Sequence, residues 1–316
     1  MSSPSLALGF GLQFSDLYAR DGLVKLDRAF LDRLQAGDVA LANRLLSARA
    51  APSAVATKDE SELLIALGPH LDSFLAALFG IETQTATLAA RTHTLNPLYA
   101  CKRLFVQRRA VKAFRPDEIA AFDPAALAAA LKRHMHEPLS ELSFATNVMT
   151  WEKTPDNYKD ALDVALRYAA WATLTEAGKV KHRKGVLFKV PQKVDPMHLV
   201  PVETIERDGV RMMRLPEHDW RQREGFALTD QGADLNHALD QINYCIWCHT
   251  QGKDSCSKGL RDKKTGAFQK TVFNVTLAGC PLEEKISEMH TLKAQGVALG
   301  AFATIIVDNP MVAGTG

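Results

Sequence analysis

Apolar residues recur at helical spacing along most of the first 180 residues, three or four positions apart on one face. Leu63, Leu64 and Leu67 show this period directly after Thr57-Lys-Asp-Glu60, which has the pattern of a capping box. We expect Gly68-Pro69 to end this helix, because proline has no amide proton and clashes with the preceding turn. The first part of the chain is therefore predicted to be a series of helices.

Further helices are indicated by the residues at their ends. Asp123-Pro124 predicts a helix start, since Asp accepts hydrogen bonds from free amide groups and proline at the first position sacrifices none. A long helix is expected over residues 158–177, where apolar residues share one face and Gly178 marks the end. From Asp234, another candidate N-cap, the chain is expected to be helical again.

Between these helical parts the pattern changes to short extended runs. Residues 179–184 are expected to form a charged link, and Gly185–Pro191 a short strand. Runs at 202–207 and 210–215 flank Asp208-Gly209, a dipeptide that accepts the positive φ angles of a tight hairpin turn. The pattern predicts a small β-hairpin inserted between helical regions.

The expected fold class is therefore mainly α, with three regions along the chain. A helical N-terminal domain covers residues 1–180, and a linker with short β-strands covers residues 181–230. An α-helical domain that carries most of the cysteines covers residues 231–316. Nothing in residues 1–230 has the pattern of a catalytic acid, base or nucleophile, so that part is expected to dock a partner or cover the cysteine site.

Composition and charge argue against some classes of protein but do not indicate a particular function. The chain has 316 residues, 47% of them hydrophobic, and a formal net charge of +2, which gives no general attraction for nucleic acid. The longest apolar run near the end, Val297–Val307, is about half of a membrane span. The first residues have no basic segment ahead of an apolar stretch, as a signal peptide would have. We expect a cytoplasmic protein without membrane insertion.

The cysteines carry the candidate chemistry. Cys101 stands alone and is expected to be a buried small hydrophobe, whereas Cys245, Cys248, Cys256 and Cys280 lie in one short segment. In a reducing compartment, clustered cysteines bind metal or do redox work more often than they form disulfides. A Cys-x-x-Cys turn lets two thiolates hold the same centre, while backbone N–H groups of the turn point at the sulfurs. Thiolates select zinc, copper(I) or iron–sulfur clusters.

Two interpretations of these four cysteines stay open on spacing alone. A structural four-Cys zinc site in a non-enzymatic helical adaptor is the first, although such sites usually contain two Cys-x-x-Cys pairs and the second pair is missing here. Three close cysteines followed by Cys280-Pro281 are typical of cluster-binding runs. Pro281 is expected to start a helix, which would place Cys280 at a helix N-terminus that favours thiolate.

The motifs around these cysteines resemble those of a known family. Tyr244-Cys-Ile-Trp-Cys-His249, Gly279-Cys-Pro281 and Ile286-Ser-Glu-Met289 are similar to the N-terminal iron–sulfur region of the glutamate synthase small-subunit family. The same region heads dihydropyrimidine dehydrogenase and related FAD-dependent pyridine nucleotide-disulfide-type oxidoreductases. Asn309-Pro310 and Gly314 follow in the family's order, so the resemblance covers about residues 243–316.

The resemblance implies an electron-transfer role. The family builds two [4Fe–4S] clusters, so Cys245, Cys248 and Cys256 would share one with a cysteine beyond Gly316, and Cys280 would ligate the other. The domain over 231–316 would be ferredoxin-like in function and truncated at its C-terminus. FAD and NAD(P)H would be bound by a longer form of the chain or by a partner subunit, and no residue here is assigned a catalytic role.

The chain departs from the family pattern in the spacing of its cysteines and in ending at Gly316, where the family continues into further cysteines and its flavin and NAD(P)H domains. Family members place the third cysteine close to the Cys-Pro, whereas residues 257–279 intervene here, and Gly259–Thr271 is expected to be an exposed loop insertion. The basic stretch over residues 102–115 is expected to be a solvated helix face and not a phosphate or nucleic-acid site. Trp247 and Tyr244 are expected to shield the thiolates from water.

Overall fold

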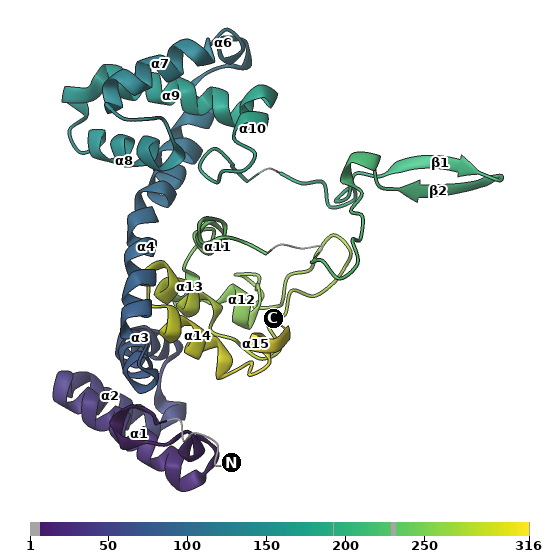
Figure 1. The fold of residues 1–316 in the computed structure, drawn as a ribbon. Coiled ribbons are helices and arrows are strands. Elements are labelled where there is room, and N and C mark those ends of the chain that lie inside the picture. Colours follow the sequence, from purple (N-terminus) through teal and green to yellow (C-terminus); the bar gives the residue numbers. More distant parts are fainter. Residues whose placement is uncertain (1–6, 192, 229–231, 316) are drawn as a thin grey trace. The chain divides into compact units, whose positions relative to one another are not determined.

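The computed structural model describes residues 7–191, 193–228 and 232–315, and in this part the chain is mainly helical with one two-stranded antiparallel sheet (Figure 1). The predicted mainly-α class with a small β-hairpin is therefore confirmed. Contacts divide the chain into two units, here called unit 1 (Met1–Tyr99 with Leu239–Gly316) and unit 2 (Ala100–Ala238). The regions expected at 1–180, 181–230 and 231–316 follow chain order, and the division by contacts does not test them.

Unit 1 combines helices from both ends of the chain. Its helices are α1 Arg20–Gly37, α2 Val39–Ala50, α3 Thr57–Phe79, α4 Glu82–Cys101, α11 Leu235–Ile242, α12 Ser255–Lys258, α13 Ile286–Ala294, α14 Ala298–Ile306 and α15 Val312–Thr315, of which α4 and α11 extend across the unit boundary. Helix α3 contacts α1 and α2 as well as α13 and α14. The C-terminal segment is therefore part of the same core as the N-terminal helices.

The expected break at Gly68-Pro69 is wrong, because α3 continues through Pro69 to Phe79. A Cβ atom on Gly68 would lie 2.4 Å from the Leu292 side chain of α13, and one on Gly300 of α14 would lie 2.5 Å from the Gly68 carbonyl oxygen. Two helices thus pack closely at this point, and this tertiary packing outweighs the local cost of an interior proline.

The expected capping box is also absent, since α3 begins at Thr57 after Ala56 and has no side-chain cap. The Thr57 carbonyl oxygen instead accepts a hydrogen bond from Ser61 Oγ at 3.1 Å. Among the described residues, α3 is the one helix long and apolar enough to cross a membrane. Length and apolar composition of this kind are also typical of a helix at the centre of a folded unit, and α3 has four helical neighbours in unit 1.

Unit 2 is arranged around α9 Lys159–Leu174, which contacts the other main helices of the unit. These are the π-helix Lys102–Ala110, α5 Val111–Ala113, α6 Pro116–Ala120, α7 Pro124–Met135, α8 Glu141–Trp151 and α10 Glu176–Lys181. The predicted start at Asp123 is confirmed, because its Oδ1 accepts the amide protons of Ala125 and Ala126 at 2.9 and 3.1 Å.

The predicted end of the long helix at Gly178 is wrong. Helix α9 ends at Leu174, and Thr175 caps α10 by accepting the Gly178 amide proton on Oγ1 at 3.0 Å. A Cβ atom on Gly178 would lie 2.4 Å from the Trp171 carbonyl oxygen, so glycine permits the close approach of the two helices. The charged residues from 179 onward therefore begin in α10 and not in a link.

The hairpin is confirmed at its turn and in its register. Strands β1 Glu203–Arg207 and β2 Val210–Arg214 pair antiparallel, with Arg207 opposite Val210. Asp208 and Gly209 between them have φ values of +55° and +75°. Positive φ at both central residues is what a tight two-residue hairpin turn requires.

The strand expected at Gly185–Pro191 is wrong, because this segment forms turns inside unit 2. Glu141 Oε2 accepts the amide protons of Val186 and Leu187 at 2.8 and 3.0 Å. Phe188 lies against Phe144 with ring centroids 5.3 Å apart. A carboxylate on another helix thus replaces the neighbouring strand that these apolar residues would otherwise need.

Candidate functional site

The Cys-x-x-Cys turn follows α11 in unit 1. The Cys245 amide donates to the Ile242 carbonyl oxygen at 3.1 Å, and the chain then turns at Trp247, which has φ of +48°. This unusual backbone angle directs the Trp247 amide at Cys245 Sγ, 3.3 Å away. The expectation that an N–H group of the turn points at a sulfur is therefore confirmed. Cys248 is buried, Cys245 and Trp247 are half-buried, and Tyr244 is exposed.

Cys256 lies on the short helix α12, close to the first two cysteines. Burial raises the pKa of the Cys256 thiol above its ordinary value, and the nearby Cys248, Asp254 and Cys245 raise it further. Both causes act in the same direction, because burial and neighbouring negative groups each disfavour the charged thiolate. A bound cation would reverse it, because positive charge favours the thiolate.

Backbone hydrogen bonds hold Cys280 next to Cys256. Its amide donates to the carbonyl oxygens of Cys256 and Ser257 at 2.9 and 3.0 Å. Glycine is required beside it, since Gly279 has φ of +87° and a Cβ atom there would lie 2.4 Å from the Gly259 nitrogen. Two backbone segments that are far apart in sequence are thus in direct contact beside Cys256.

The residues between Cys256 and Cys280 form a loop whose two ends are joined by backbone hydrogen bonds. Leu260 donates its amide proton to the Leu277 carbonyl oxygen at 3.0 Å, and Leu277 donates to Gln269 at 2.9 Å. Residues 261–267 are exposed, as expected for an insertion. The long spacing before Cys280 therefore does not separate it from the other cysteines.

The expectation that Cys280 sits at a helix N-terminus is wrong. Residues 281–285 form turns, with Glu283 at φ of +50°, and α13 begins only at Ile286. Pro281 therefore starts a turn and not a helix. Stabilisation of the Cys280 thiolate by a helix dipole has no basis in this geometry.

Helix α13 brings a buried serine to the cysteine turn. Ser287 Oγ lies 3.8 Å from Cys245 Sγ and is hydrogen-bonded to Nδ1 of the buried His249. Ser287 thus lies between the imidazole of His249 and the thiol of Cys245. Ser287 belongs to the quoted Ile286–Met289 motif, but its role was not predicted.

Two buried carboxylates lie beside this turn. Burial raises the pKa of Asp254, partly offset by the Ser257 amide, which donates to its Oδ1 at 3.3 Å, and the Glu288 carboxylate raises it further. Glu288 is 1% exposed and accepts a hydrogen bond from Ser61 Oγ of α3 at 2.5 Å. Within the described residues, Glu288 Oε2 and Ser257 Oγ have no hydrogen-bond partner.

Sequence reasoning missed these polar neighbours, because nothing in their local pattern shows that α13 and α3 cover the cysteine turn. The only signal was indirect: Asp254 precedes Cys256 by two residues, and Ser287 and Glu288 lie inside a motif used for the family resemblance. Buried polar groups without partners cost free energy, so their presence here is typical of a functional site.

The four cysteines suit a thiolate-bound group by their chemistry and their common location. In the part of the chain that the structure describes, however, no three His, Cys, Asp or Glu side chains are arranged as a ready coordination sphere. Ligation would therefore require the thiol groups to turn toward one point.

The other candidates lie in unit 2. Cys101 is fully buried, as predicted, and burial raises the pKa of its thiol. The basic stretch is only partly a solvated face: Arg108, Arg109 and Lys112 are exposed, whereas Lys102 is buried together with Phe105, Val106 and Ala110. Arg109 forms an ion pair with Glu152 at 2.5 Å, which places this arginine in a local structural contact.

Comparisons with known proteins identify relatives but no activity. A family model described as "RP005 N-terminal alpha-helical domain" matches residues 8–80, which include α1, α2 and α3. The "Uncharacterized protein RP005" of Rickettsia prowazekii (strain Madrid E) is 32% identical over 304 residues, which cover 92% of this chain and 99% of that protein. No solved structure matches the chain. Since the similarity extends over nearly the whole of both proteins, the chain belongs to the RP005 family.

Proposed function

We propose that Cys245, Cys248, Cys256 and Cys280 bind iron–sulfur clusters, and that the chain is the electron-transfer segment of an NAD(P)H- and FAD-dependent oxidoreductase similar to the glutamate synthase small subunit. The observation that carries this proposal is the backbone contact between Cys280 and Cys256, at 2.9 Å from amide nitrogen to carbonyl oxygen. This contact places Cys280-Pro281 next to Cys256, although residues 257–279 separate them in the sequence.

A bound iron–sulfur cluster supplies one-electron chemistry, and the protein supplies ligation, hydrogen bonds and the surrounding dielectric. The Trp247 amide, 3.3 Å from Cys245 Sγ, is a donor to a ligand sulfur. Ser287 Oγ, at 3.8 Å from the same sulfur, is a second polar neighbour. Donors of this kind stabilise the added negative charge and so tune the reduction potential of a centre.

The exposure of the four cysteines is uneven, which suits electron exchange with a second protein or domain. Cys248 is buried and Cys245 and Cys280 are half-buried, whereas Cys256 is exposed. We infer that the Cys256 side faces the partner, which would carry FAD and NAD(P)H in a longer form of the chain or in a second subunit. In this role the segment over 231–316 is ferredoxin-like in function and works in the cytoplasm.

The buried polar groups behind the turn support a redox site better than a purely structural one. Asp254, Glu288, Ser257 and Ser287 are all buried, and two of their oxygen atoms have no partner among the described residues. A structural metal site is stabilised by closure and full hydrogen bonding, so unsatisfied atoms next to it would add only cost. Beside a redox centre they tune the field at the sulfurs.

The experiment that tests this function is the iron, zinc and acid-labile sulfide content of the protein purified without oxygen. We expect iron with a matching amount of sulfide and a broad visible absorption. Stoichiometric zinc without sulfide, in a colourless protein, would contradict the proposal and establish the structural zinc site of a helical adaptor.

A further inference from the structure

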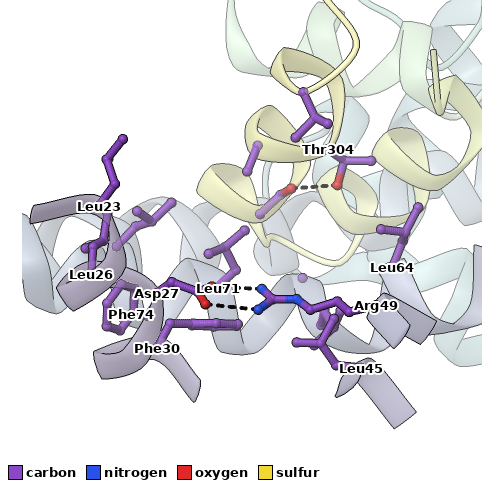
Figure 2. A pocket seen from close by; sticks show the side chains of 16 residues that line it. Leu23, Leu26, Asp27, Phe30, Leu45, Arg49, Leu64, Leu71, Phe74 and Thr304 are labelled. Atoms are coloured by element: carbon purple, nitrogen blue, oxygen red, sulfur yellow. Dashed lines mark hydrogen bonds and ion pairs between the residues drawn. The ribbon is translucent and has the colours of Figure 1, made fainter. Parts of the chain in front are cut away.

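Unit 1 contains a cavity of about 350 Å³ that the cysteine site does not use (Figure 2). Four helices line it: α1, α2, α3 and α14. Leucine and phenylalanine side chains form most of the wall, among them Leu26, Phe30, Leu64 and Phe74. Its volume lies at the small end of the range typical of ligand pockets, about 300–1,000 Å³.

The cavity lies where two hydrophobic clusters of unit 1 meet. One is centred on Leu34, Leu41, Ala42 and Leu63, and the other on Leu12, Phe74 and Leu78. Phe30 packs against both clusters and also lines the cavity. Protein interiors normally close such gaps, because lost packing contacts are costly. This pocket is open to solvent at one side, where Leu23 and Val307 are exposed, so its apolar wall is accessible to a ligand.

Small residues at the crossing of α3 and α14 keep the gap open. Gly68, Gly300 and Ala303 line the cavity. A Cβ atom on Gly300 would lie only 2.5 Å from the Gly68 carbonyl oxygen, so the close crossing itself requires glycine. Ala303, one turn along α14, has no such constraint, and a larger side chain there would fill the space.

The charged groups at the cavity neutralise each other. Arg49 and Asp27 form a two-bond ion pair, with nitrogen–oxygen distances of 3.0 and 2.8 Å (Figure 2). They are the two charged side chains among the described lining residues. The Thr304 hydroxyl donates to the Gly300 carbonyl oxygen at 2.9 Å, so it is already satisfied. Arg49 keeps further N–H groups that can donate to a ligand.

We propose that this cavity binds an uncharged, mainly hydrocarbon small molecule of two or three rings, or an aliphatic chain of similar volume, with one hydrogen-bond acceptor facing Arg49. A charged ligand would have to displace Asp27 from Arg49 or lose its hydration against leucine side chains, and both are unfavourable. An apolar ligand gains by removing the exposed apolar wall from water. The inference does not depend on the cysteine site.

The test uses two fluorescent probes with the same ring skeleton, the neutral phenylnaphthylamine and its anionic sulfonate, anilinonaphthalene sulfonate. Titrated into the full chain, the neutral probe is expected to saturate a single site. The sulfonate is expected to bind about ten-fold more weakly or worse, which corresponds to about 1.4 kcal/mol.

Three variants locate the probe and test the charge argument. Ala303→Phe fills the cavity and should weaken the neutral probe about ten-fold. The matched control, Ala129→Phe on an exposed position of α7 in unit 2, should leave it unchanged. Asp27→Asn releases the positive charge of Arg49, so the sulfonate should bind more tightly and the difference between the probes should shrink.

Equal binding of both probes to the native chain would overturn the proposal, as would binding that Ala303→Phe does not affect. The alternative to a small molecule is that a helix of a second copy of the chain occupies the cavity, and sedimentation tests this by measuring whether the chain forms dimers. Dimers that Ala303→Phe dissociates, in a protein that takes up neither probe, would show that the cavity is a protein interface. Asp27→Asn keeps the test valid if Ala303→Phe does not fold.

Discussion

Each unit contains a glutamate with little exposure, Glu141 half-buried in unit 2 and Glu288 buried in unit 1, and the two carboxylates have different partners. In unit 2, Glu141 Oε2 accepts two backbone amide protons, and Oε1 lies 3.8 Å from Nδ1 of His182. In unit 1, Glu288 accepts one hydrogen bond from Ser61, and its second oxygen has no partner among the described residues. One oxygen of each carboxylate thus has no hydrogen-bond partner among the described residues, but the carboxylate of unit 2 holds a chain segment in place, whereas that of unit 1 lies beside the cysteine turn.

The two units also differ in how closely their side chains pack. In unit 2, the rings of Phe144, Tyr168, His182 and Phe188 contact one another, and a Cβ atom on Gly185 would lie 2.0 Å from Glu141 Oε1. Unit 1 instead leaves a cavity of about 350 Å³ between its two hydrophobic clusters. Unit 2 therefore shows the features of a structural core, and unit 1 shows those of a binding unit.

The largest expected effect separates the cysteines of the two units. Cys245→Ser and Cys280→Ser should each lose metal from protein purified without oxygen, because each removes a proposed ligand. If two clusters are present, the two variants should perturb different spectroscopic signals.

Cys101→Ser is the matched control, since its thiol is buried in unit 2, whereas the other four cysteines belong to unit 1. It should retain all metal and only lose stability, because burial places a hydroxyl in an apolar site. Full metal content in Cys245→Ser, or metal loss in Cys101→Ser, would contradict the prediction that the cysteines of unit 1 bind the metal and that of unit 2 does not.

Substitution of Glu141 and substitution of Glu288 should lower the free energy of unfolding by different amounts. Glu141→Ala leaves the Val186 and Leu187 amide groups unpaired, so we expect the free energy of unfolding to fall by about 3 kcal/mol. Glu288→Gln keeps an acceptor for Ser61 and removes a charge that lacks a second partner, and should change it by about 1 kcal/mol or less. Urea denaturation measures both, and equal losses would contradict the comparison.

Two histidines should make folding acid-sensitive, since burial lowers the pKa of His290 in unit 1 and, to a larger extent, that of His182 in unit 2. Burial, with a smaller contribution from Lys181, lowers the pKa of His182 from 6.5 to about 4. Between these values the unfolded chain binds a proton that the folded chain does not, so stability is lost as the pH falls through this range. The shift corresponds to at most about 3 kcal/mol, because solvent screens this half-buried group.

Urea denaturation followed by tryptophan fluorescence suits this measurement, because Trp151, Trp171 and Trp220 all lie in unit 2. His182→Gln should flatten the pH dependence. His198→Gln changes a histidine of the same unit whose side chain is 81% exposed, and should leave it unchanged. An unchanged slope in His182→Gln would place the acid-sensitive group elsewhere.

The smallest effects distinguish two helix caps. Asp123 caps α7 from the adjacent position, whereas Asp72 of α3 caps α14 from far away in the sequence, accepting the Leu299 and Gly300 amide protons at 2.7 and 3.1 Å. Replacing either by Ala should cost about 1 kcal/mol. Only Asp72→Ala should also weaken the neutral probe, because α14 lines the cavity. Equal probe binding in both variants would show that the cap does not position α14 for the ligand.

Features that depend on a few neighbouring residues followed from the sequence alone. The hairpin turn at Asp208-Gly209 needs only two residues that accept positive φ, and the caps at Asp123 and Asp234 bond amide groups two or three positions away. The Cys-x-x-Cys turn is equally local, which is why the direction of the Trp247 amide was predictable. These interactions form within one turn of chain and need no partner from elsewhere.

Features that depend on distant partners were decided only by the tertiary structure. Helix α3 continues through Pro69 because α13 and α14 pack on Gly68, and Gly185–Pro191 is not a strand because Glu141 bonds its amide groups. At the candidate site, the sequence indicated which thiols were involved, while folding determined that Cys280 contacts Cys256 and that Ser287 and Glu288 cover the turn. The physical reason is that a long-range contact depends on the packing of whole helices, which no local pattern encodes.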